Sequence, residues 1–259
     1  MTATALDSTT YAAEETRLRR ELAAVYRLVA HFTMTDLILN HISVRLPGPE
    51  HQFLLNPYGL LYEEVTASSL VIVGLDGQLI TDGPWPVNPA GFVIHSAIHE
   101  AREDALCVLH THSKYGCAVA AQEGGLLPLS QTAMEFYDRV AYHDYEGIAL
   151  SNAEKSRLVA DLGDKPVMIM RNHGLLTTGA TPGQAFLRVF NLERACEIQI
   201  AAQAGGGPLI VASHEVAERT ARQFEGDQGG DDYGADDRPD LAWDALFRLV
   251  ERLYPDYKD

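Results

Sequence analysis

Apolar residues near the N-terminus recur with the spacing of an amphipathic helix. They follow one another at steps of four, three, four and three residues, so they share one helix face. The positions are Leu18, Leu22, Val25, Val29 and Phe32. The residues before position 14 are small and polar, so we expect 1–13 to be a flexible N-terminus.

Further along the chain, short apolar runs alternate with turn residues such as Pro-Gly-Pro at 47–49 and Asp76-Gly77. The expected strands are 42–46, 53–55, 71–73, 79–80, 105–112, 167–170 and 175–178. The expected helices of this region are 92–101 and 154–162. Strands and helices mix without regular βαβ units, which predicts an α/β sandwich with a largely antiparallel sheet.

A capping box opens a long helix in the C-terminal third. Thr181 is the expected N-cap, Pro182 takes the first helical position and Gln184 follows three residues after the cap. This helix is expected to end near Ala204, before three glycines. The main domain is therefore 14–207, and 208–259 form a C-terminal extension.

The extension contains an acidic segment and a second helical pattern. Residues 225–240 hold seven acids, one arginine and four glycines, which is typical of a flexible linker. Apolar positions resume helical spacing over 241–253, so we expect a terminal helix that docks on the body or on another subunit.

Composition narrows the class of protein. The 259 residues include 20 Lys and Arg against 36 Asp and Glu, and the net charge of −16 argues against nucleic acid or an anionic membrane as a partner. No apolar run is long enough for a membrane span, and the first ten residues do not form a signal peptide. The three cysteines are scattered, which is typical of reduced thiols in a cytoplasmic protein.

The histidines carry the candidate chemistry. His110 and His112 stand two residues apart on an expected strand, so both imidazoles leave the same face. His173 lies in an Arg-Asn-His-Gly turn after another strand. Three imidazoles with an open coordination position are the layout of a catalytic metal centre. Taken alone, a His-x-His pair also occurs by coincidence, and a histidine in a turn is often a cap or a surface residue.

The segment from about Leu18 to Ala204, roughly 70% of the chain, resembles the class II aldolase/adducin family. The matching segments are Asn40–Arg45, Leu55–Gly59, Gly74–Gly77, Asn88–Gly91, Val108–Ser113 and Asn172–Gly174. The resemblance implies a three-layer α/β/α sandwich, a cyclic homotetramer and active sites at subunit interfaces. It also implies that His110, His112 and His173 bind a divalent cation, most often zinc, with iron and manganese as alternatives.

The chain departs from the sugar-phosphate aldolases of that family at three places. Those enzymes have Ser-Ser-Glu, with a proton-shuttling glutamate, where this chain has Pro89-Ala90-Gly91. They have Gly-Asn at Asn40-His41 and Thr-Gly at Tyr58-Gly59. These replacements remove hydroxyl donors for a phosphate and add bulk, so we expect a small carboxylate substrate without phosphate. The Asn-Pro-Ala-Gly segment resembles the adducin-like branch.

The resemblance and the local sequence together give two groups of further site residues. The expected substrate contacts are His41, Tyr58, Asn88, Gly91 and Gln131, the last in a loop that could close over a neighbouring subunit's site. The expected acid or base candidates are His95, Glu146 and Tyr145. His95 follows Gly91 by one helical turn, and His99 extends the same face. A polar crevice without chemistry remains the alternative for His95, and a solvated turn for Glu146.

Three functions remain open. The first is a divalent-metal lyase that cleaves a C–C bond in a small oxo or hydroxy acid, by retro-aldol reaction or decarboxylation, through a metal-stabilised enolate. The second is a non-haem iron oxygenase that uses the same three histidines, although the common iron triad includes a carboxylate. The third is a non-catalytic adducin-like scaffold, which predicts loss of the metal ligands.

Overall fold

The computed structural model describes residues 8–48, 50–81, 83–148, 152–226 and 241–259. The strands are β1 (His41–Arg45), β2 (Phe53–Leu55), β3 (Val71–Val73), β4 (Cys107–Thr111), β5 (Val140–His143), β6 (Val167–Met170) and β7 (Gly174–Gly179). The helices are α1 (Ser8–His31), α2 (Pro89–Ala101), α3 (Lys114–Ala120), α4 (Gln131–Met134), α5 (Asn152–Leu162), α6 (Pro182–Ala204), α7 (His214–Phe224) and α8 (Leu241–Leu253). Short 3-10 helices are Tyr62–Glu64 and Pro255–Lys258.

The seven strands form one mixed sheet in the order β3-β2-β1-β4-β7-β6-β5. All neighbouring strands are antiparallel except β5 and β6, which are parallel. The expectation of a largely antiparallel sheet in an α/β protein is therefore confirmed. The order places β4 in the middle of the sheet, between β1 and β7, so the end of β4 is surrounded by protein.

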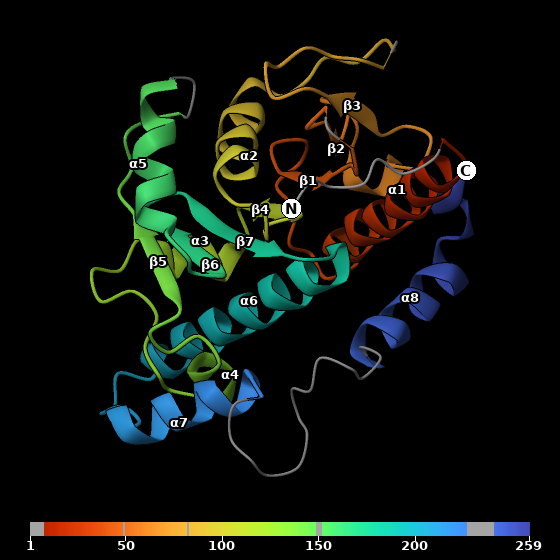
Figure 1. Cartoon of the computed structure of the whole chain (residues 1–259). Helices are drawn as coiled ribbons and strands as arrows, with labels where there is room; N and C mark the ends of the chain where they lie inside the picture. The colour runs from red at the N-terminus through yellow and green to blue at the C-terminus, as the bar shows by residue number, and fades with distance from the viewer. Residues whose placement is uncertain (1–7, 49, 82, 149–151, 227–240) are drawn as a thin grey trace.

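Helices contact the sheet from both faces, as Figure 1 shows for α6 and α5. Strand β6 shows how the sheet is shared. Val167 and Ile169 pack in the cluster formed with α1 and α6. Met168 and Met170 pack in the cluster formed with α2 and α5. All four are buried, which explains why β6 reads as a continuous apolar run rather than an alternating one.

The helix boundaries differ from expectation at the N-terminus. Helix α1 begins at Ser8, so the part of the expected flexible segment 1–13 that the structure describes is helical. The segment has no glycine or proline after Ser8, and ion pairs from Arg17 to Glu14 and Glu21 stabilise the turns of α1 that directly follow it. Residues 1–7 lie outside the described residues.

Helix α6 begins as the capping pattern predicts, with one difference. Thr181 Oγ1 accepts from the Gln184 N–H at 3.1 Å, and Pro182 occupies the first turn. The Gln184 side chain accepts from Ala180 N–H at 2.7 Å instead of from the cap residue itself. The helix therefore ties down the loop that leaves β7.

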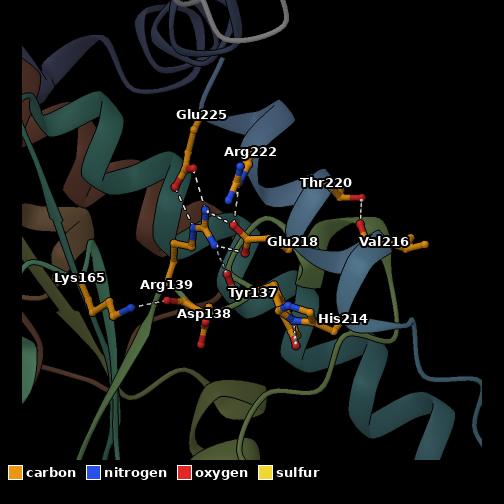
Figure 2. Close-up of polar contacts among 10 residues, drawn as sticks. All are labelled: Tyr137, Asp138, Arg139, Lys165, His214, Val216, Glu218, Thr220, Arg222 and Glu225. Carbon is orange, nitrogen blue, oxygen red and sulfur yellow. Dashed lines mark hydrogen bonds and ion pairs between the residues drawn. The ribbon is translucent and has the colours of Figure 1, made fainter. Parts of the chain in front are cut away.

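The extension contains a helix that the sequence analysis did not predict. Helix α7 is held to the body by Arg139, which pairs with Glu218 at 2.5 Å and Glu225 at 2.8 Å (Figure 2). Glu225, the first residue of the expected acidic linker, is thus a fixed C-cap of α7. Positions 227–240 of that linker lie outside the described residues.

The terminal helix α8 matches its expected range and docks on the body of the same chain. It contacts α1 and α6, and Val250 is fully buried there. The indole of Trp243 lies against Gly183 of α6, where a Cβ would stand 2.6 Å from Cδ2 of the indole. No helix of the described residues combines the length and the apolar character needed to cross a bilayer.

Candidate metal centre and its pocket

His110 and His112 leave the end of β4 with fixed ring orientations. His110 is buried, and its Nδ1–H donates to the Leu175 carbonyl of β7 at 2.9 Å. His112 Nδ1 lies 3.0 Å from the Asp36 carboxylate. Because both Nδ1 atoms face acceptors, each ring carries its proton there and presents an unprotonated Nε2. This arrangement of outer hydrogen bonds is the one that metal-binding histidines use.

His173 reaches the same place from the turn between β6 and β7. The turn is tight: Asn172 has a φ of +54°. A Cβ at Gly174 would stand 2.3 Å from the Thr111 carbonyl oxygen, so the glycine is needed for the close approach of this turn to β4. The Cys117 thiol donates to the His173 carbonyl oxygen at 3.0 Å. These contacts hold the turn beside the end of β4.

The three Nε2 atoms converge on one point. The His173 Nε2 lies 3.2 Å from that of His110 and 3.0 Å from that of His112. His173 has at most one Nε2 proton, so hydrogen bonds cannot satisfy both contacts and lone pairs face each other. A tetrahedral ion with Zn–N bonds of about 2.05 Å separates its nitrogen ligands by about 3.3 Å. The donor set therefore fits a divalent cation.

Burial favours the neutral imidazoles that a metal requires. Burial, with help from neighbouring imidazoles, lowers the pKa of His110 well below its usual range. The same cause lowers the pKa of His173 to about 4. Both rings are thus neutral at pH 7, and a cation does not have to displace protons from them.

A carboxylate on α6 fixes the corner that follows His112. Glu193 accepts from the Ser113 hydroxyl at 2.6 Å and from the backbone N–H groups of Tyr115 and Gly116 at 3.0 and 2.7 Å. These are the free donors at the start of α3, and a negative charge is favourable there. The contact locks the direction of the chain directly after the second histidine.

A pocket of about 440 Å³ opens beside the three histidines. This volume suits a small ligand. Its walls include His41, Tyr58, Asn88, His112, Tyr145 and His173. None of the described residues that line it is a lysine or an arginine. The described part of the lining therefore offers polar and aromatic groups but no cationic side chain.

The expected substrate contacts divide into two groups. His41, Tyr58 and Asn88 line the pocket, and Asn88 also caps α2 by accepting from the Ala90 and Gly91 N–H groups. Gly91 is buried behind His41: a Cβ there would stand 2.8 Å from the His41 ring. Gln131 is the exposed first residue of α4 and does not line the pocket within the described part of the chain.

The expected acid and base candidates are also separated by the fold. Tyr145 lines the pocket, and its ring centroid lies 6.2 Å from that of His173. His95 is fully buried one hydrogen bond behind His41, at 2.7 Å from His41 Nδ1. Glu146 is paired with Arg157 at 2.6 Å, and this hydrogen bond lowers the pKa of the carboxylate. Geometry thus favours Tyr145 over Glu146 and gives His95 an indirect position.

Sequence reasoning missed three residues that support the site. Asp36 and Glu193 come from distant segments, and no local pattern marks them. Ser43, which contacts both His95 and His99, could have been found, because it stands two residues after His41 on a strand and so shares its face.

Comparison with known proteins identifies the family of the chain. The family model described as the Class II Aldolase and Adducin N-terminal domain matches residues 20–200. A solved aldolase II superfamily protein from Pseudomonas syringae is 50% identical, with a TM-score of 0.87, over 95% of this chain and 96% of that one. An L-fuculose 1-phosphate aldolase from Glaciozyma antarctica is 30% identical, with a TM-score of 0.84, over 99% and 97%.

The similarity extends to a eukaryotic branch. Alpha-adducin of Mus musculus is 42% identical over 255 residues, which is 95% of this chain and 35% of alpha-adducin. The region that the family model matches contains the three histidines, the strand that carries His41 and the start of α2. Because the family model covers most of the chain and the fold agrees, the chain belongs to the class II aldolase and adducin family.

Proposed function

We propose that this protein is a divalent-metal-dependent lyase that cleaves a C–C bond in a small oxo or hydroxy acid without a phosphate. The observation that supports it best is the convergence of the His110, His112 and His173 Nε2 atoms beside a pocket. When bound, a divalent cation stabilises the negative charge that develops next to a carbonyl as a C–C bond breaks. We propose zinc as the ion, with iron or manganese as alternatives.

The chain's own residues set the character of the substrate. Without a lysine or arginine among the described lining residues, the pocket has no side chain to neutralise a phosphate dianion. Tyr58, Tyr145 and Asn88 offer hydroxyl and amide groups that orient a smaller polar molecule. Ile94 and Pro89 add apolar surface, which favours a substrate with a carbon side chain.

The similarity to alpha-adducin keeps a scaffold without catalysis as a second candidate. The iron oxygenase has less support, because the cluster of candidate ligands in the described residues contains three histidines and no carboxylate. The Asp36 carboxylate contacts the outer nitrogen of His112, so it orients a ligand instead of acting as one.

Metal analysis of protein purified without added ions tests the proposal. We expect about one zinc or manganese ion per chain, and less than a tenth of that in His110→Ala and His173→Ala. His214→Ala is the matched control, because that histidine contacts Tyr137 away from the site. Chelation without any change in thermal stability would favour the scaffold. Bound iron with substrate-dependent oxygen uptake would favour the oxygenase.

Activity is then measured on the metal-loaded protein. We expect cleavage of some members of a panel of 2-oxo and hydroxy acids, detected by carbonyl release, and no cleavage of sugar phosphates. Cleavage of a sugar phosphate alone would contradict the proposed substrate class. We further propose a homotetramer with sites at its subunit interfaces, which light scattering on the eluting protein tests. A monomer with full activity would contradict that assembly.

A further inference from the structure

A chain of buried hydrogen bonds runs from the pocket wall into the protein. His41 Nδ1 lies 2.7 Å from His95 Nε2, and His95 Nδ1 is hydrogen-bonded to the Ser43 hydroxyl. The same hydroxyl lies 2.7 Å from His99 Nε2. His99 Nδ1 lies 3.2 Å from the Ala105 carbonyl oxygen, where the chain ends. All of the side chains in it are buried.

The carbonyl at the inner end fixes the direction of every bond. A carbonyl oxygen only accepts, so His99 carries its proton on Nδ1 and its Nε2 accepts from the Ser43 hydroxyl. Ser43 has then used its one proton and must accept from His95 Nδ1–H. His95 Nε2 is therefore bare and accepts from His41 Nδ1–H.

Neutral rings are required for this assignment, and the surroundings supply that condition. Burial lowers the pKa of His99 to about 3 and that of His95 well below its usual range. A second proton on His95 or His99 would reverse the bonds that follow it and give His41 the other tautomer, so the assignment belongs to the neutral rings. With every ring neutral, these are the only hydrogen-bond directions that satisfy all the groups in the chain.

The remaining side of the His41 ring faces the pocket. One ring face stacks on His110, with centroids 4.9 Å apart. The Nδ1 side meets His95, and the Cδ2 side lies against Gly91. His41 nevertheless lines the pocket, and the described residues offer no hydrogen-bond partner for its Nε2. That nitrogen is left for a ligand.

We infer that His41 is a specificity-determining residue whose Nε2 is a permanent hydrogen-bond acceptor, and that it selects a substrate with a hydroxyl at this point. Ser43, His95 and His99 are positioning residues that hold the ring in this form. A carboxylate or phosphate oxygen facing the same nitrogen meets lone pair against lone pair, so it is disfavoured there. The inference rests on the proposed function only in taking the ligand to be a hydroxy acid.

Nitrogen NMR of the metal-free protein tests the ring state without any activity assay. With ¹⁵N-labelled histidine at pH 7.5, we expect the His41 Nδ1 signal to be that of a protonated ring nitrogen and the Nε2 signal that of a bare one. Each ring is assigned by its loss in a single variant, such as His95→Gln. A protonated Nε2 on His41 in the native protein would overturn the inference.

Variants of the serine provide a second readout. In Ser43→Ala we expect His41 to show averaged signals from both tautomers, and in Ser43→Thr the native pattern to return. Ser96→Ala is the matched control, because Ser96 is buried on the same helix as His95 but donates to the Val93 carbonyl. An unchanged His41 pattern in Ser43→Ala would contradict the proposed chain of bonds. The native-protein measurement decides the matter if a variant does not fold.

Binding to the zinc-loaded protein tests the selectivity. Lactate and pyruvate are matched probes, because they differ in a hydroxyl against a carbonyl oxygen. We expect lactate to bind about fivefold more tightly, the size of one ordinary hydrogen bond, and this ratio to approach one in Ser43→Ala. Equal affinities in the native protein would overturn the selectivity. A protein that binds no zinc would defeat the proposed function but leave the NMR result intact.

Metal content separates this role from direct ligation. His41 lies outside the cluster of three histidines, so we expect His41→Phe to keep its full zinc content while losing the lactate preference. Loss of zinc from this variant, with His110 and His173 unchanged, would make His41 a ligand and overturn the inference.

Discussion

His41 and His110 stand directly opposite each other on the paired strands β1 and β4, and their rings stack at an interplanar angle of 30°. The strand register thus joins the metal centre to the pocket wall. A shift of one residue in this pairing would turn His41 to the other face of the sheet. The identity of the pocket therefore depends on sheet pairing as much as on residue type.

Asp36 should control metal affinity without being a ligand. Asp36→Ala removes the acceptor of His112 Nδ1–H, so we expect zinc affinity to fall about 10- to 100-fold in competition with a chelator. Asp36→Asn keeps an acceptor oxygen and should fall less. Asp104→Ala, which breaks an exposed pair with Arg102, is the control. Equal zinc affinity in Asp36→Ala and the native protein would refute the role.

Glu193 should couple folding stability to the metal centre. Glu193→Ala leaves three donors at the start of α3 without an acceptor, so we expect a loss of about 3 kcal/mol in urea unfolding. Zinc affinity should fall too, because His112 precedes this corner. Glu197→Ala, on the same helix but in an exposed pair with Arg194, should change stability by less than about 0.5 kcal/mol. Similar losses in both variants would contradict the assignment.

Gly91 offers a test in which two effects oppose each other. A helix is ordinarily more stable by about 1 kcal/mol with alanine than with glycine at an interior position. At this position a Cβ would stand 2.8 Å from the His41 ring, so we expect overpacking to win and the variant to lose about 1–3 kcal/mol. Gly207→Ala, where nothing lies within 4 Å, is the control in thermal unfolding. A stabilised Gly91→Ala protein would show that His41 moves freely.

Stability of the metal-free protein should fall on acidification. The pKa of His99 is about 3 in the fold and about 6.5 when unfolded, so the unfolded chain binds more protons between these values. The neutral His99 ring therefore makes its full contribution to the free energy of unfolding above pH 6.5. About 2 kcal/mol of that stability is lost by pH 5. His41, with a pKa lowered to about 3 by burial, acts in the same direction.

One half-buried carboxyl opposes this trend. Burial raises the pKa of Glu135 from 4.5 in the unfolded chain to about 7 in the fold. The stability that the protonated carboxyl contributes is therefore present below pH 4.5 and is lost as the pH rises through 7. Glu135→Gln should therefore make the fall from pH 6.5 to 5 steeper. Urea unfolding of both proteins at the two pH values is the measurement. A native protein that is more stable at pH 5 than at 6.5 would contradict the histidine assignment.

Arg139 should govern the docking of α7. Arg139→Ala removes the pairs with Glu218 and Glu225 (Figure 2), so we expect faster hydrogen exchange in peptides covering His214–Phe224 and a loss of about 1 kcal/mol. Arg194→Ala breaks only an exposed pair on α6 and should leave that exchange unchanged. Native protection of α7 in Arg139→Ala would mean that its apolar contacts suffice.

The elements with strong local signals were predictable. The range of α8 and the start of α6 follow from apolar spacing and from the Thr181 cap, both of which act within a few residues. Strand β5 and helices α3, α4 and α7 were missed. Val140–His143 alternates between half-buried and buried positions beside polar neighbours, and α7 depends on Arg139 from another segment.

The metal ligands could be predicted from the sequence more completely than the roles of the pocket residues. His110 and His112 were predictable as a pair because a strand puts alternate residues on one face. The role of His95 was not predictable, because the packing of α2 on β1 decides whether a helix histidine faces the pocket or the interior. Glu146 looked available in the sequence, but Arg157, eleven residues later, occupies its carboxylate.

By itself, the sequence determined the family, most of the regular elements and the three imidazoles, because each of these depends on residue types at short or recurrent spacing. Only the tertiary structure decided that Asp36, Glu193 and Leu175 orient that centre, and that His41 faces the pocket while His95 lies behind it. The physical reason is that hydrogen-bond direction and burial belong to groups brought together across the sheet, and no local pattern of residues encodes which groups will meet.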